Sequence, residues 1–307
     1  MLLQVMVIVF ITAFISLKLV TTLTCKENHI DLRYNFYLLK SSHRSLADKL
    51  HVENVESVEL CKQITRQYKG LAFNYNTKEN YSNKGTITGN ISRDHYWEQP
   101  QLYFNCHILK CPEGVSSKTL ISDRSFDYYS LYEKLIVAKN YICIPEVGLF
   151  TLNTEPETFE NATLKCRKQN ADEFTTGCGS LAHIASETRT TALTQILLEH
   201  NQKQEEINLK SKINLAYVGL SFNRTRGQRF EMFNMDDDSL KCFAYRAWEP
   251  GNPKMSSNLR NTSCVALSSH STWLTVDCKR KLPYFCEILT KCGEEKDGWE
   301  ESNVEVN

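Results

Sequence analysis

Twelve cysteines are the feature of this 307-residue sequence that most restricts its fold, because their role depends on the redox compartment. An apolar stretch from Leu2 to Leu17, followed by Lys18, is typical of a secretory signal peptide. A spanning helix needs roughly 20 apolar residues, so an uncleaved signal anchor is only the alternative. We therefore expect residues 1–24 to be removed, the mature chain to be secreted and extracellular, and its cysteines to pair as disulfides.

Composition and motifs exclude several classes of protein. The 36 basic and 36 acidic residues cancel, which argues against binding nucleic acid through bulk charge. The sequence contains no motif for a zinc protease, a serine hydrolase or a phosphate-binding loop, so we expect neither an enzyme nor a cofactor. Glycosylation is expected on some of the Asn-x-Ser/Thr sequons, which are Asn80, Asn90, Asn161, Asn223 and Asn261.

The first half of the mature chain has the pattern of a small module of mixed helix and strand. Apolar residues recur at intervals of three and four in the later part of 52–68, which predicts a helix carrying Cys61. Residues 71–76 alternate like a strand, and a second short strand is expected over 102–109. The acidic stretch 293–307 at the other end of the chain predicts a solvated tail.

Residues 25–143 resemble a PAN/apple-type module. The marks are the helix with Cys61, the run Leu71-Ala72-Phe73-Asn74-Tyr75 after it, and the run 126–134, which is similar to the closing Phe-Asp-x-Tyr-Glu strand of the family. The resemblance implies the disulfides Cys25–Cys143 and Cys61–Cys106. A generic disulfide-stapled module of mixed helix and strand is the alternative.

The second half shows a longer series of elements. Thr154-Glu155-Pro156-Glu157 has the pattern of a capping box and predicts a helix after it, with Phe159, Ala162 and Cys166 on one face. Ser186 is expected to cap a second helix. Strands and a turn-rich loop are predicted, in chain order, over 180–184, 213–220, 248–253 (the loop) and 283–287.

Residues 144–292 resemble the C-type lectin-like fold, an α+β fold with two helices. The marks are Tyr217-Val218-Gly219-Leu220, the loop Trp248-Glu249-Pro250-Gly251-Asn252-Pro253 and the terminal Phe285-Cys286-Glu287. The resemblance implies the disulfides Cys166–Cys286 and Cys264–Cys278. It also implies that Pro253 is in the cis form.

The parity of the cysteines carries a further prediction. If the first module closes at Cys143, it contains five cysteines and the second contains seven, so full pairing needs a bridge between them. The unassigned cysteines suggest Cys178–Cys242 and the inter-module bridge Cys111–Cys292. A rival scheme pairs Cys25 with Cys111 and Cys143 with Cys292.

The calcium site of the lectin family is not retained in this sequence. Aligned on the surrounding Trp, Gly and Cys residues, the ligand positions fall on Asn252-Pro253-Lys254, Thr262 and Leu274-Thr275. Calcium prefers six to eight oxygen ligands, several of them carboxylates, and these positions offer no carboxylate. We therefore expect no metal and no calcium at the sugar site of the family.

The combined pattern predicts a calcium-independent recognition or adhesion protein that binds an extracellular protein or glycan. The ligand would contact the long loop over about residues 222–262. A structural component of the extracellular matrix and a calcium-dependent carbohydrate-binding lectin are the alternatives. The aromatic, amide and cationic side chains expected to contact the ligand are Arg246, Trp248, Asn252, Lys254 and Arg260.

Overall fold

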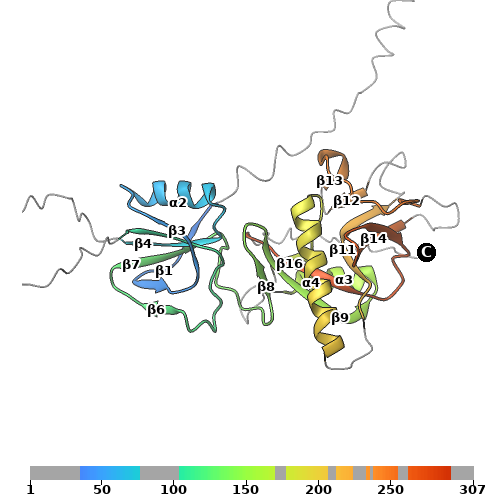
Figure 1. Ribbon diagram of the computed structural model, residues 1–307, viewed down its shortest axis with the longest axis horizontal. Coiled ribbons are helices and arrows are strands. Elements are labelled where there is room, and N and C mark those ends of the chain that lie inside the picture. Colours follow the sequence, from blue (N-terminus) through green and yellow to red (C-terminus); the bar gives the residue numbers. More distant parts are fainter. Residues whose placement is uncertain are drawn as a thin grey trace, which may run out of the picture. The chain divides into compact units, whose positions relative to one another are not determined.

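Two large β-sheets organise the chain in the computed structural model (Figure 1). The structure describes residues 35–76, 104–169, 178–206, 212–223, 233–235, 238–254 and 262–291. They belong to one compact unit that begins at Tyr34. Within these ranges, no helix is both long and apolar enough to cross a membrane. The predicted signal peptide, the acidic tail and the sequons at Asn80, Asn90 and Asn261 lie outside the described residues.

The first sheet has five antiparallel strands in the order β1-β7-β4-β5-β3. These are β1 (Tyr37–Lys40), β7 (Phe126–Ser130), β4 (Ala72–Asn76), β5 (Cys106–Leu109) and β3 (Lys49–Glu53). The strands expected within 71–76 and 102–109 are β4 and β5, which pair with each other. The run interpreted as a closing strand contains β7, which pairs with β4. This segment is thus a module of mixed helix and strand, and its kinship to PAN/apple modules stays a prediction.

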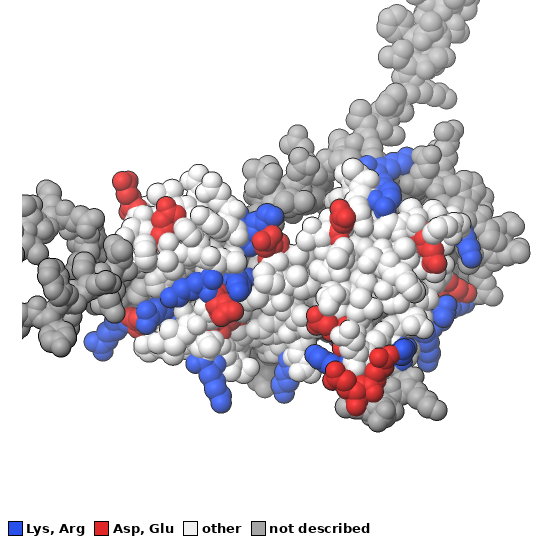
Figure 2. Space-filling view, viewed as in Figure 1, with Lys and Arg blue, Asp and Glu red and all other residues white. Residues whose placement is uncertain are grey.

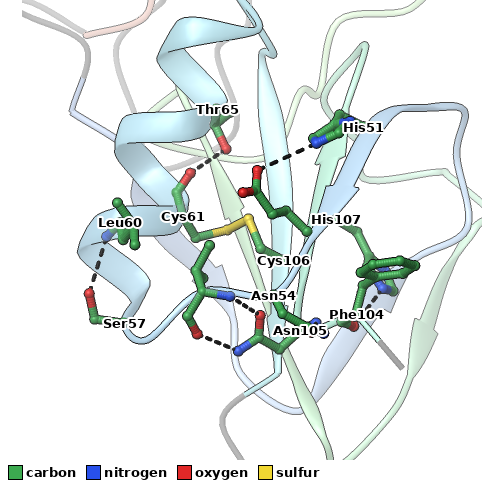
Figure 3. The surroundings of a disulfide bond; sticks show 12 residues. His51, Asn54, Ser57, Leu60, Cys61, Thr65, Phe104, Asn105, Cys106 and His107 are labelled. Atoms are coloured by element: carbon green, nitrogen blue, oxygen red, sulfur yellow. Dashed lines mark hydrogen bonds and ion pairs between the residues drawn. A yellow bond between two sulfur atoms is a disulfide. The ribbon is translucent and has the colours of Figure 1, made fainter. Parts of the chain in front are cut away.

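Helix α2 (Val58–Gln67) lies over one face of this sheet (Figure 1). Ser57 caps it by accepting a hydrogen bond from the backbone N–H of Leu60 at 3.2 Å. Its buried side chains, Cys61 and Ile64 among them, sit at helical spacing and face the sheet. The predicted disulfide Cys61–Cys106 is confirmed and ties this helix directly to β5 (Figure 3).

The opposite face of the sheet carries a buried polar network. The fully buried side chain of Asn74 accepts from the backbone N–H of Ser45 and donates to its carbonyl, both at 2.8 Å. The hydroxyls of Ser45 and Thr119 donate to the buried carboxylate of Glu113. Asn74 belongs to β4, whereas Ser45, Glu113 and Thr119 come from the two-stranded sheet of β2 (His43–Ser45) and β6 (Leu120–Ser122) and the loop before β6. The network satisfies polar groups that would otherwise destabilise the core.

The second sheet has nine strands, with β13-β12-β11-β16-β9-β8 as its main path and β10, β14 and β15 attached to it. Helices α3 (Phe159–Arg167) and α4 (Glu187–Glu206) pack with it. The short 3-10 helix η2 (Leu240–Cys242) follows β13. The strands are β8 (Ile142–Ile144), β9 (Gly148–Glu157), β10 (Gly179–Leu181), β11 (Leu215–Asn223), β12 (Phe233–Met235), β13 (Asp238–Ser239), β14 (Thr262–Ser268), β15 (Trp273–Val276) and β16 (Leu282–Ile288).

The capping box predicted at Thr154 is wrong, although the helix it was meant to start is present. Residues 154–157 belong to β9, whose last residue Glu157 pairs with Leu282 of β16. The N-cap is Thr158, whose side chain accepts from the N–H of Asn161 at 3.3 Å. Cross-strand pairing thus extends the strand through a sequence that would suit a helix start.

Four disulfides among the described residues show which cysteine predictions hold. Cys166–Cys286 and Cys264–Cys278 are confirmed, as is Cys61–Cys106. Cys111 instead bonds Cys143, with Cα atoms 6.1 Å apart. This bond contradicts Cys25–Cys143 and Cys111–Cys292, and both bridges of the rival scheme, Cys25–Cys111 and Cys143–Cys292.

The reason for the corrected pairing is the position of Cys143. It lies on β8, which pairs with β9 in the nine-stranded sheet, whereas Cys111 follows β5 of the five-stranded sheet. The bond therefore links the two sheets through a cysteine that had been assigned to the first module. Cys178 and Cys242 are also disulfide-bonded, and their pairing with each other stays a prediction. Cys25 and Cys292 lie outside the described residues.

Candidate ligand-binding site

The base of the long loop is anchored on Trp273, a fully buried residue of β15. The rings of Tyr245 and Trp248 each meet the Trp273 ring edge-on, at centroid distances of 5.5 Å. The backbone N–H of Trp273 donates to the carbonyl of Ala247 at 2.7 Å, and its carbonyl accepts from Glu249 at 3.0 Å. Trp248 is therefore half-buried and packs against the core, so its ring acts first as an anchor for the loop.

The turn after Trp248 is joined to β15 by the chain's own hydrogen bonds. The side-chain oxygen of Asn252 accepts from the backbone N–H of Thr275 at 3.0 Å and from its hydroxyl at 2.9 Å. The hydroxyl oxygen of Thr275 also accepts from the backbone N–H of Lys254 at 2.9 Å. The Asn252–Pro253 peptide bond is cis, as the family resemblance implied.

These contacts join two of the sequence positions where calcium-dependent relatives would place metal ligands. Asn252 is the first residue of the aligned triplet, and Thr275 is the second residue of the aligned pair. The two side chains are hydrogen-bonded directly to each other. Among the described residues, no group of three or more His, Cys, Asp or Glu side chains is placed to hold a metal ion. Thr262, the third aligned position, is the first residue of β14.

The candidate contact residues have different surroundings. The side chain of Lys254 is exposed, and that of Asn252 is half-buried and occupied by Thr275. Arg246 turns its guanidinium to the backbone carbonyls of Leu240, Phe243 and Tyr245. Arg260 lies outside the described residues. Lys254 is thus an exposed cation next to the turn at Asn252, whereas the exposed guanidinium of Arg246 is held by backbone carbonyls.

Thr275 is the site residue whose role sequence reasoning missed. It was considered only as a position without a carboxylate, whereas its hydroxyl connects Asn252 to Lys254. No local pattern signals this role, because its partners lie more than twenty residues away along the chain.

Charged side chains of both signs lie on the visible face of the molecule. Figure 2 shows Lys and Arg interspersed with Asp and Glu, without one sign covering that face.

Two of the predicted glycosylation sequons lie among the described residues. Asn161 is exposed in the first turn of α3, and Asn223 ends β11. Their glycosylation stays a prediction.

Comparison with known proteins agrees with this architecture in the second half of the chain. Residues 155–288 match the family model described as the Lectin C-type domain. No curated protein matches the chain. Among solved structures, human lithostathine is 20% identical over 49% of this chain and 97% of its own, with a TM-score of 0.36. The mouse scavenger receptor C-type lectin carbohydrate-recognition domain is 18% identical over 50% and 97%, also with a TM-score of 0.36.

The family model identifies residues 155–288 as a C-type lectin domain, a fold of recognition proteins. The fold prediction for the second half is therefore confirmed at that level. Four disulfides in the described part of the chain fit an extracellular protein.

Proposed function

We propose that this chain is a secreted recognition protein that binds an extracellular protein or glycan through its lectin domain without calcium. The observation that carries the proposal is the direct hydrogen bonding of Asn252 to Thr275. Secretion rests on the apolar segment before residue 25 and on the disulfides.

Calcium independence follows from the chemistry of these two residues. The side-chain oxygen of Asn252 already accepts two hydrogen bonds, which is the capacity of an amide oxygen. Calcium would need several carboxylate oxygens in place of these contacts, and the aligned positions offer an amide, a lysine, a leucine and threonines. The loop base is thus ordered by internal hydrogen bonds where a metal-dependent relative would use the ion.

The ligand contacts are expected on the loop over 222–262. Lys254 offers an exposed ammonium next to a turn that is fixed on β15. Arg260 is expected to add a second cation on the same loop. A cation on an ordered backbone loses less conformational freedom on binding, which favours a specific contact with an anionic or hydroxyl-rich group.

A glycan array with the full-length secreted protein, in calcium and in EDTA, tests the proposal. We expect the same binding profile in both buffers, and Lys254→Ala should weaken whatever binding is found. Thermal unfolding in the two buffers supplies a readout that needs no ligand, because a bound ion would raise the melting temperature. Mannose or galactose binding that disappears in EDTA would contradict calcium independence and favour the lectin alternative.

A designed variant provides the positive control. Lys254→Asp combined with Leu274→Asn and Thr275→Asp returns oxygen ligands to the aligned positions. If the scaffold is that of a calcium lectin without its ligands, this variant should gain a calcium-dependent rise in melting temperature. Retention of the native protein in the insoluble matrix, without binding on any array, would instead favour the structural alternative.

A further inference from the structure

Three backbone carbonyls at the start of the long-loop base converge on one guanidinium. Nη1 of Arg246 donates to the carbonyls of Phe243 at 2.6 Å and Tyr245 at 2.7 Å, and Nη2 donates to that of Leu240 at 2.8 Å. Residues 243–247 form neither helix nor strand. Their carbonyls therefore need partners other than a regular backbone ladder.

We propose that Arg246 is a positioning residue, a surface guanidinium that orders the segment from Leu240 to Trp248 within the long loop and so fixes the position of the turn that follows Trp248. This role differs from the ligand contact predicted from the sequence. It goes beyond the proposed function, because it concerns how the loop base is built and not what the loop binds.

The geometry suits arginine specifically. Its planar fork presents several N–H donors at once, whereas lysine offers a single nitrogen on a flexible stem. One guanidinium can thus reach the carbonyls of Tyr245, Phe243 and Leu240, which lie one, three and six residues before it in the chain. Burial lowers the pKa of the guanidinium, but an arginine remains charged in proteins.

The ordered segment leads directly to the candidate site. Leu240 is buried in the core, and Tyr245 and Trp248 pack against Trp273. Between these anchors, the described contacts of the Arg246 side chain are all with the backbone of its own segment. Loss of the guanidinium should therefore loosen residues 243–249 while leaving the five-stranded sheet intact.

Hydrogen exchange on the full-length protein tests this role. In Arg246→Ala, amides of residues 243–249 should exchange at least about tenfold faster. The reason is that loss of a hydrogen bond to a charged group shifts the equilibrium between the closed and open segment by more than about tenfold. Amides of β4 and β5 should be unchanged, which also shows that the variant is folded. Lys279→Ala, which removes an exposed cation elsewhere in the domain, is the matched control and should leave both regions as in the wild type.

Chemical rescue separates a guanidinium-specific role from a general loss of packing. Methylguanidinium should restore protection of 243–249 in Arg246→Ala, and equal concentrations of potassium or calcium should not. Arg246→Lys should behave like the alanine variant. Wild-type exchange in either variant, or the absence of rescue by methylguanidinium, would overturn the proposal. Because no ligand is involved, these results are independent of the outcome of the glycan array.

Discussion

Arg189 of α4 and Glu287 of β16 form an ion pair whose side chains are only 20% and 15% exposed. The same glutamate accepts from the backbone N–H of His183 at 3.1 Å, and Arg189 donates to the carbonyl of His183 at 2.8 Å. The guanidinium also lies over the ring of Phe150, 5.3 Å from its centroid. This pair fastens the long helix of the lectin domain to its central strand.

Removing one partner of this pair should be strongly destabilising. We expect Arg189→Ala to lower the free energy of unfolding by about 2–3 kcal/mol, because the largely buried Glu287 would lose its charged hydrogen-bond partner. Lys69→Ala is the control, since its pair with Glu146 at 3.1 Å is exposed and should contribute less than about 1 kcal/mol. Denaturant unfolding measures both, and equal losses in the two variants would contradict this difference.

His107 should make stability depend on pH in the acid range. Burial, with smaller contributions from Lys49 and Arg44, lowers its pKa from 6.5 to about 4, against a raising effect of the Phe104 carbonyl. Between these values the unfolded chain binds a proton that the folded chain does not, so stability falls as pH drops from about 6.5 to about 4. The fall in pKa from 6.5 to about 4 corresponds to a loss of about 3 kcal/mol.

The His107→Gln variant isolates this contribution from that of the carboxylates. Glutamine can donate to the carbonyl of Phe104, which accepts from the imidazole at 3.0 Å, but it does not titrate. Urea unfolding at neutral and acid pH should show a smaller loss in the variant than in the wild type. An identical pH dependence in both proteins would show that the imidazole is already accessible to protons in the folded state.

The disulfide Cys111–Cys143 should appear directly in a non-reducing peptide map. A peptide joining Cys111 to Cys25 or Cys292 would contradict it.

Loss of Cys166–Cys286, which spans 120 residues, should cost about 4–5 kcal/mol in the chain-entropy model. Loss of Cys264–Cys278, which spans 14, should cost about 3 kcal/mol, so secretion should fall further in the first variant.

Two glycines of the lectin domain should respond differently to alanine. A Cβ at Gly219 would lie 2.6 Å from the backbone oxygen of Leu181, so the two strands must separate. We expect a loss of about 1–3 kcal/mol in unfolding free energy. Gly251 has φ +82 and open space around it, so its substitution should cost only about 1–2 kcal/mol of backbone strain. A larger loss at Gly251 than at Gly219 would contradict the predicted order.

Local patterns in the sequence determined most of the lectin domain. The order of helices, strands and the Trp-x-Pro-Gly-x-Pro loop depends on nearby residues and hydrophobic period, and three disulfides followed from the family resemblances. Residue type alone decided that the aligned positions Asn252-Pro253-Lys254, Thr262 and Leu274-Thr275 carry no carboxylate.

Contacts between distant parts of the chain decided the rest. Residues 154–157 remain in a strand whose last residue, Glu157, pairs with Leu282 of β16, and Cys143 bonds Cys111 because β8 joins the second sheet. The exposed side chain of Arg246 donates to three backbone carbonyls, and Thr275 reaches Asn252 across 23 positions. Each outcome depends on which groups meet in space, and a one-dimensional pattern carries that information only where the partners lie within a few residues.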